Sequence, residues 1–503
     1  MKRKRIRRPD ARPMRHPSHP RPLTRRQFLG QGFLSGAALV AGPSLLGFFR
    51  TPEARAQALA CGVSGAAGRI PFLCFDLAGG ASIAGSNVLV GGPGGQLDLL
   101  TDAGYERLGL PATLTPAADP LQVNTDLGLA FHADSAFLRG ILTKAAPATL
   151  ANVNGAVICA RSENDTGNNP HNPMYGINKA GADGSLVTLI GTQSSESGGN
   201  SQAPLAMIDP TVRPTKVDRA ADARGLVDTG KLVQLLNQQD AESVMFALER
   251  ISQVKLAKMN EDQVVKDLIQ CAYSESTDLV GTFGNPAVLD PFQDPLIAGQ
   301  PTSIFSAGEM AQSRFERTAA VMKLVLNGFA GAGTIELGGY DYHNGTRATG
   351  EVRDFEAGVA MGACLEYAAR IGQQLMLYVF SDGSLDSDGQ LDNSVNGRGK
   401  GVWRGDNSST SASFFLVYDP AGRPALTSPA RSQIGYYRSS GSIETNATRV
   451  SNNVTLLAES IVLNYMALHG DQGSFAQALP THGLGSAAEL DSLIAFQPIR
   501  STP

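Results

Sequence analysis

The stretch Gly333-Thr-Ile-Glu-Leu-Gly-Gly-Tyr-Asp-Tyr-His343, followed by residues 351–371 and by Gln374-Leu-Met-Leu-Tyr-Val-Phe380, decides the fold. The first and last pieces contain apolar runs of strand length, and the segment between them repeats its apolar residues at helical spacing. A strand, a helix and a second strand in this order form a crossover unit whose two strands are parallel. The sequence therefore predicts α/β organisation around this segment.

The same alternation of strands and helices extends in both directions along the chain. Residues 156–160 are continuously apolar, which is typical of a strand that helices cover on both faces. We therefore expect an α/β fold, a three-layer α/β/α sandwich with a mainly parallel sheet. Further strands are expected at 69–76, 151–160 and 412–418, and further helices at 311–329 and 454–469.

Two intervals depart from this rhythm. Residues 212–275 have helical spacing and few glycines, so we expect a helical insertion there. Residues 383–406 are rich in glycine and aspartate and are expected to form a loop. The mature chain, residues 59–503, is therefore expected to be one α/β domain that carries one insertion.

The first 58 residues are predicted to be an export signal that is removed. Thr24-Arg25-Arg26-Gln27-Phe28-Leu29 is similar to the twin-arginine consensus, and a glycine-interrupted apolar stretch follows at 28–49. Small residues at 54–58 suit a cleavage site. We expect the twin-arginine translocase to export the chain, which would then be periplasmic or secreted. A basic tail with an uncleaved signal anchor is the alternative that the sequence leaves open.

Removal of this leader changes the net charge of the chain. Residues 1–58 hold 13 of the 42 Lys and Arg and 2 of the 46 Asp and Glu, which leaves 29 bases against 44 acids, a net charge of −15. A surface of that sign repels nucleic acid. No later apolar run in the sequence reaches the ~20 residues of a membrane-spanning helix. We therefore expect no nucleic-acid partner and no permanent membrane span.

Acidic residues follow three of the predicted strands, at the edge where their carboxyl ends meet. These residues are Asp76, Asp341 and Asp382, and His343 lies two positions after Asp341. Residues i and i+2 of an extended segment face the same side, so Asp341 and His343 are expected to point together. Carboxylates with an imidazole suit zinc, and carboxylates alone suit magnesium or calcium. The sequence therefore predicts a divalent metal site at this edge, with simple turn-forming acids as the alternative.

Three further features bear on ligands. His171 lies in Asn168-Asn-Pro-His-Asn-Pro173, after the strand at 151–160, which makes it a second candidate for the site. The four carboxylates within residues 382–392 do not match the pattern of a calcium-binding loop, and we interpret that segment as a solvated turn. The glycine run at 91–95 lacks the ending of a phosphate loop, so no nucleotide site is predicted.

Several motifs resemble the exported bacterial domain-of-unknown-function family numbered 1501, which belongs to the alkaline-phosphatase and sulfatase-like superfamily. The most specific match is Gly339-Tyr-Asp-Tyr-His343, which is similar to the family's Phe-Asp-Thr-His. The other matches follow the family's order, and they are Phe75-Asp-Leu-Ala-Gly-Gly80, Leu127-Gly-Leu-Ala-Phe-His132, Pro170-His-Asn172, Val379-Phe-Ser-Asp-Gly383 and Trp403-Arg-Gly-Asp-Asn407.

This resemblance implies an alkaline-phosphatase-like sandwich in which one or two metal ions hold a phosphate or sulfate ester for a nucleophile. It implies Ser82 as the nucleophile and His171 as a catalytic residue. Ser82 stands near where the relatives carry an acid, and Asn407 replaces a histidine. The metal ligands that it implies are Asp76, Asp341, His343, Asp382 and Asp406.

Because two expected ligands are replaced, the sequence leaves two functions open. The first is a metal-dependent hydrolase of phosphate or sulfate esters with a degenerate site. The second is a non-catalytic exported protein of the same fold that serves in binding or in cell-envelope assembly, since one fold supports many functions.

Overall fold

The computed structural model describes residues 69–163, 168–227, 250, 251, 255 and 286–500. The chain divides into two compact units, Gly62–Val227 with Asn285–Pro503, and Met1–Cys61 with Asp228–Gly284. Apart from residues 250, 251 and 255, the described residues belong to the first unit. The expected export signal at 1–58 and most of the expected insertion at 212–275 lie outside the described residues.

An eight-stranded sheet is the centre of the first unit. In spatial order its strands are β12 (Gln433–Ile434), β4 (Val153–Ile158), β11 (Ser413–Tyr418), β8 (Leu375–Ser381), β1 (Phe72–Ala78), β7 (Ala330–Gly338), β5 (Val187–Gly191) and β6 (Thr215–Lys216). Among these strands β11 alone pairs antiparallel with its two neighbours, and all other pairings are parallel. The expectation of an α/β fold with a mainly parallel sheet is therefore confirmed.

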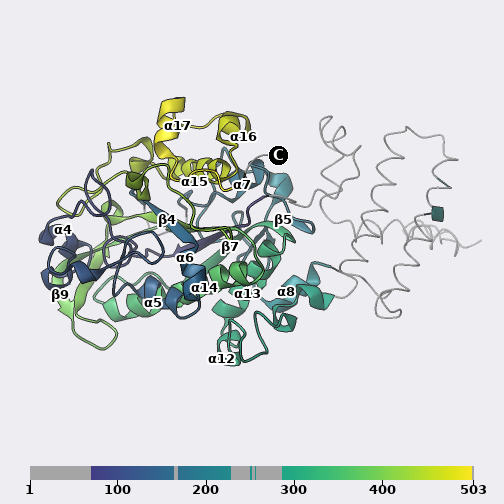
Figure 1. The fold of residues 1–503 in the computed structure, drawn as a ribbon, viewed down its shortest axis with the longest axis horizontal. Coiled ribbons are helices and arrows are strands. Elements are labelled where there is room, and N and C mark those ends of the chain that lie inside the picture. The colour runs from purple at the N-terminus through teal and green to yellow at the C-terminus, as the bar shows by residue number, and fades with distance from the viewer. Residues whose placement is uncertain (1–68, 164–167, 228–249, 252–254, 256–285, 501–503) are drawn as a thin grey trace, which may run out of the picture. The chain divides into compact units, whose positions relative to one another are not determined.

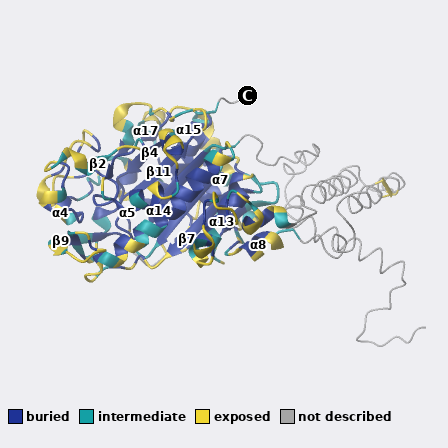
Figure 2. Cartoon of the chain, turned by 60° about the horizontal axis from the view of Figure 1, so that its bottom comes forward, coloured by how far each residue is buried: buried dark blue, intermediate teal, exposed yellow. Residues whose placement is uncertain are grey.

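Helices cover both faces of this sheet. α13 (Ser313–Leu326) and α14 (Arg347–Arg370) pack on one face, and α7 (Met174–Lys179) and α15 (Val454–Leu468) contribute to the core on the other. Figure 1 shows α15 above the strands, with α13 and α14 below them. Buried residues fill the strands and the helix faces that meet them (Figure 2). This arrangement is compatible with a three-layer sandwich.

Alternation along the central strands decides which face each site residue occupies. Cys74 of β1 belongs to the apolar core that includes α7 and α15. Because successive side chains of a strand point to opposite faces, Asp76 also lies on the α7 and α15 side. Tyr378 and Phe380 of β8 belong to the same core, which places the following Asp382 on that side as well.

Close packing against α5 (Ala136–Leu142) fixes the position of α14. A Cβ atom on Gly358 would lie 2.2 Å from the backbone oxygen of Phe137, and one on Gly362 would lie 2.6 Å from that of Ile141. The small residues of α14 therefore let the two helix backbones touch. Any larger side chain at these positions would push α14 away from α5.

The loop expected at 383–406 is a β-hairpin, so that expectation is wrong. β9 (Leu385–Asp392) pairs antiparallel with β10 (Lys400–Asp406), with register shifts on either side of Trp403. Leu385 and Trp403 are buried and attach the hairpin to the rest of the unit. The glycine and aspartate content of the segment conceals these two anchors, since both residue types are depleted in strands.

The remaining elements are short and lie around this framework. β6, which begins inside the segment expected to be an insertion, pairs with β5 of the main sheet. The strand at β5 was not expected from the sequence. The other short elements are α4 (Asp102–Arg107), β2 (Val123–Asn124), β3 (Phe131–His132), α6 (Pro147–Ala151), α8 (Ala220–Gly225), α12 (Ala307–Met310), α16 (Phe475–Ala478) and α17 (Ala487–Leu493).

Candidate functional site

Asp76 is held at the end of β1 by the loop that follows β5. The N–H groups of Asn200 and Ser201 donate to Asp76 Oδ2, each at 2.7 Å, and the Ser201 hydroxyl donates to Oδ1 at 3.1 Å. The side chain is fully buried. Both oxygens of this carboxylate therefore accept hydrogen bonds from the chain itself.

Asp382 lies at the end of the neighbouring strand β8 and is also fully buried. Its Oδ1 accepts a hydrogen bond from the N–H of Gly79 at 2.9 Å, and its Oδ2 accepts one from the Asn200 side chain at 3.0 Å. Asn200 thus bridges Asp76 and Asp382, because its backbone donates to one and its side chain to the other. The structure places together these two residues that the sequence proposed as ligands.

The pKa of Asp76 reflects this buried position. Burial raises the pKa from 3.8 to about 7, the negative charge of Asp382 adds to the rise, and hydrogen bonds from Ser201 oppose it. A Cβ atom on Gly199 would lie 2.6 Å from Asp76 Oδ2, so backbone packs directly against this carboxylate. Backbone and hydrogen-bond donors of the chain therefore pack closely around Asp76.

His171 is buried beside the same strand end. Its ring stacks on Phe380, with centroids 5.9 Å apart and planes 6° apart. The nearby Asn169 donates from its side chain to the backbone oxygen of Asp382 at 2.8 Å. Neither nitrogen of His171 has a hydrogen-bond partner within the described residues. Burial lowers the pKa of His171 to about 3, which favours the neutral ring.

A second acidic group lies at the carboxyl ends of the strands but is exposed. His343 Nδ1 lies 2.6 Å from Asp341 Oδ1 and 3.3 Å from Asp406 Oδ1. Asp341 and His343 follow β7, whereas Asp406 ends β10. The side chains of Asp341 and Asp406 are 63% and 51% exposed, so water screens their charges. Asp341 and His343 point together, and the hairpin supplies the third residue.

Gly79 lies where these two groups meet. Its N–H donates to Asp382, and a Cβ atom on it would lie 2.8 Å from the backbone nitrogen of Asp341. Its φ of +112° is one that residues with side chains rarely adopt.

In the described part of the chain, no three or more His, Cys, Asp or Glu side chains are arranged to hold a metal ion. The five ligands implied by the resemblance therefore divide into two separate clusters.

Ser82 belongs to another buried network. Its N–H donates to the Tyr342 hydroxyl at 3.0 Å, and Tyr342 donates to Asp354 Oδ1 at 3.2 Å. Asn87 donates to Asp354 Oδ2 at 2.7 Å, and burial raises the pKa of Asp354 to about 7. Over residues 69–163, 168–227 and 286–500, no histidine or carboxylate hydrogen-bonds to the Ser82 hydroxyl. Within these ranges Ser82 is therefore not hydrogen-bonded to a base that would activate it as a nucleophile.

Sequence reasoning missed a cluster of buried charges that fixes the hairpin. Glu351 accepts hydrogen bonds from Lys400 Nζ at 2.8 Å and from Arg347 at 2.7 Å, and Lys400 is fully buried. The guanidinium of Arg347 lies 4.5 Å from the ring centre of Trp403. Lysine is almost never fully buried unless it is paired. The cluster stabilises β10, which ends at Asp406, and nothing in the local sequence around Lys400 indicates its distant partner.

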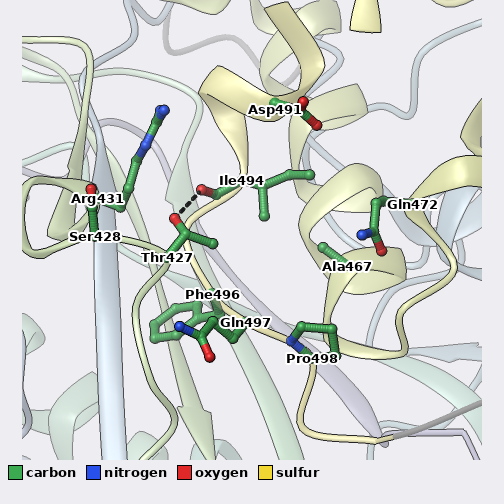
Figure 3. Close-up of a pocket in the computed structure, with 10 residues that line it drawn as sticks. All are labelled: Thr427, Ser428, Arg431, Ala467, Gln472, Asp491, Ile494, Phe496, Gln497 and Pro498. Carbon is green, nitrogen blue, oxygen red and sulfur yellow. Dashed lines mark hydrogen bonds between the residues drawn. The ribbon is translucent and has the colours of Figure 1, made fainter. Parts of the chain in front are cut away.

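The cleft in Figure 3, with a volume of about 340 Å³, lies away from both acidic clusters. Ala467, in the last turn of α15, lines it, and the Thr427 hydroxyl donates to the backbone oxygen of Ile494 at 3.1 Å. The N–H of Ile70 donates to His469 at the end of α15, so this end of the helix lies near the start of β1. The cleft therefore lies at the amino ends of the parallel strands, opposite the acidic clusters.

Comparisons with known proteins supply no family for this chain. No protein-family model matches it, and no curated protein matches it. The family resemblance therefore rests on the motifs of the sequence. The helices among the described residues include none that combines the length and the apolar character needed to cross a membrane.

Proposed function

We propose that the chain is an exported binding protein on an alkaline-phosphatase-like α/β fold, without ester hydrolysis at its strand ends. One observation carries this proposal. All four side-chain oxygens of Asp76 and Asp382 accept hydrogen bonds from groups of the chain itself. A metal ion at this position would compete with Asn200 and Ser201 for the same carboxylate oxygens. The two carboxylates instead hold the loop after β5 in place by accepting hydrogen bonds from Asn200 and Ser201.

The leader and the sheet support the export part of the proposal. The twin-arginine translocase would carry the chain across the membrane already folded. Parallel pairing joins strands that are far apart in the sequence, such as β1 with β7 and β8. Such contacts slow folding, so completion of the fold before export would protect the exposed strands. The periplasm or the exterior would then be the place of action.

Hydrolysis assays test the proposal directly. The mature protein, residues 59–503, is incubated with phosphate and sulfate monoesters in the presence of zinc, magnesium or calcium. We expect the wild type to show no more turnover than Asp76→Asn and Asp382→Asn variants. Turnover by the wild type that disappears in both variants, while their fold is retained, would overturn the proposal.

A second candidate function rests on the exposed cluster. Asp341 Oδ1 and Asp406 Oδ1 lie 2.6 Å and 3.3 Å from His343 Nδ1. Oxygen and nitrogen are donors that suit zinc, but the described residues are not arranged to hold an ion, so zinc would bind here only after these side chains shift. A bound ion would polarise an ester oxygen, with Asp341 and Asp406 as its oxygen ligands and His343 as its nitrogen ligand. This function predicts zinc binding by the wild type that is lost in Asp341→Asn. Asp388→Asn, which changes another exposed aspartate, is the matched control.

A further inference from the structure

A cleft of about 350 Å³ between the start of α13 and the side of α14 is lined by three arginines. Arg314 and Arg317 come from the first turns of α13, and Arg353 comes from α14. The lining also contains Leu337 and Tyr340, both of which are buried. None of the residues proposed for the acidic clusters lines this cleft, so it is a separate feature of the carboxyl end of β7.

The charges that line this cleft are not balanced within it. Its one lining carboxylate belongs to Glu356, which pairs with both Arg314 and Arg353, the latter at 3.2 Å. Arg317 turns away from Glu356 and pairs with Glu336 at 3.1 Å, and also with Asp218 at 3.0 Å. One carboxylate is therefore shared between two guanidinium groups at the cleft wall.

The crowding of these arginines has an electrostatic cost. Burial lowers the pKa of Arg314, and the positive charges of Arg353 and Arg317 lower it further. An anion in the cleft would offset this repulsion. The side chains of Arg314 and Arg353 are 32% and 37% exposed, so a ligand from solvent can reach them.

The chemistry of the lining selects the class of anion. A planar guanidinium matches the two oxygens of a carboxylate, and the pairing of Glu356 shows that these arginines already hold one. Leu337, Tyr340 and Ala357 also line the cleft but are almost fully buried, so polar groups supply most of the surface that a ligand would meet. An organic ligand that carries more than one carboxylate could pair with Arg314 and Arg353 at the same time.

We propose that this cleft binds a small organic carboxylate, which displaces or joins Glu356 between Arg314 and Arg353. The first turn of α13 adds to the site, because the N–H groups of a helix start favour negative charge. The inference deepens the proposed binding function by naming a ligand class, and it rests on that function. Failure to bind a carboxylate would leave the result of the ester-hydrolysis assays unchanged, so the two ideas fail separately.

Isothermal titration calorimetry with citrate as the probe tests this proposal on the mature protein. We expect Arg353→Gln to weaken citrate binding by about tenfold, because it removes a charged hydrogen-bond donor. Glu356→Gln should strengthen binding, because it removes the internal competitor while leaving the arginines in place. This gain separates a binding role from simple damage to the fold. Arg431→Gln, which changes an arginine of the other cleft, should leave binding unchanged.

Salt and a second anion complete the test. Citrate binding should weaken as ionic strength rises from ~50 mM to ~300 mM, because salt screens charges at an open cleft. Inorganic phosphate should bind more weakly than citrate. Absence of citrate binding by both the wild type and Glu356→Gln would overturn the proposal. Weaker binding by Glu356→Gln, or equal binding of phosphate and citrate, would also overturn it.

Discussion

Replacing Asp76 with asparagine should change how the stability of the protein depends on pH. In the wild type, burial raises the pKa of Asp76 to about 7, with a further contribution from the charge of Asp382. Asparagine keeps the shape of the side chain and one oxygen acceptor for the N–H groups of Asn200 and Ser201. It cannot ionise, so it removes the cost of a negative charge at this buried position.

The sign and the size of this effect follow from proton binding. A carboxyl with a higher pKa in the folded protein binds more protons when folded, so the free energy of unfolding falls as pH rises between the two pKa values. For Asp76 this interval runs from 3.8 to about 7. Between pH 5 and 8 the wild type should lose ~3 kcal/mol through this residue, at ~1.4 kcal/mol for each pH unit below 7. Asp76→Asn should lose none of it.

Other groups also titrate in this range, so the difference between two proteins is the useful quantity. Asp354 has a pKa raised by burial to about 7 and acts in the same direction as Asp76. Burial lowers the pKa of His132 and His469 to about 4 and that of His171 to about 3. Each of these histidines therefore lowers the free energy of unfolding as the pH falls below the ordinary histidine pKa of 6.5. These contributions are common to the wild type and Asp76→Asn and cancel in the difference.

Urea unfolding measures this difference at pH 5, 6, 7 and 8. Trp403 is the single tryptophan of the chain and is buried, so its fluorescence reports unfolding. Circular dichroism on the same samples checks that the transition is two-state. Relative to the wild type, the free energy of unfolding of Asp76→Asn should rise by ~3 kcal/mol between pH 5 and pH 8. A difference independent of pH would refute the reasoning, because it would show that Asp76 stays ionised beside a balancing cation.

Three other variants test other parts of the account. Lys400→Met should lower the free energy of unfolding by ~3 kcal/mol in urea titrations, because it breaks the buried pair with Glu351, and an unchanged midpoint would contradict this. Gly199→Ala should cost ~1–3 kcal/mol in a thermal melt, because its Cβ would lie 2.6 Å from Asp76 Oδ2, and wild-type stability would contradict the close packing. Replacing Arg25 and Arg26 with lysines should leave the folded precursor inside the cell on fractionation, whereas normal export would contradict the twin-arginine prediction.

The crossover unit and the neighbours of the site could be predicted because they depend on short-range patterns. Apolar runs that end in Asp76 and Asp382 mark two strands, and the strand order then places both acids at one edge. The spacing of Asp341 and His343 sets their common direction. These features need only the periodicity of strands and helices and the geometry of a parallel sheet.

The rest of the site depends on contacts between distant parts of the sequence. Asn200 and Ser201 reach Asp76 from 124 and 125 residues away, and no local pattern marks them as its hydrogen-bond donors. The hairpin that brings Asp406 to His343 is anchored by Lys400 and its distant partner Glu351. Such pairings depend on the packing of the whole unit. The sequence analysis therefore assigned all five proposed metal ligands to one site, whereas the structure places them in two clusters.

The metal content of the mature protein tests the central claim most directly. The protein is purified without chelators, dialysed, and analysed by inductively coupled plasma mass spectrometry beside Asp76→Asn and Asp382→Asn. The side-chain oxygens of Asp76 and Asp382 already accept hydrogen bonds from the chain. We therefore expect far less than one zinc, magnesium or calcium ion for each chain, with no difference between the wild type and these variants. About one ion for each wild-type chain, lost in both variants, would contradict the account and restore a metal centre at the strand ends.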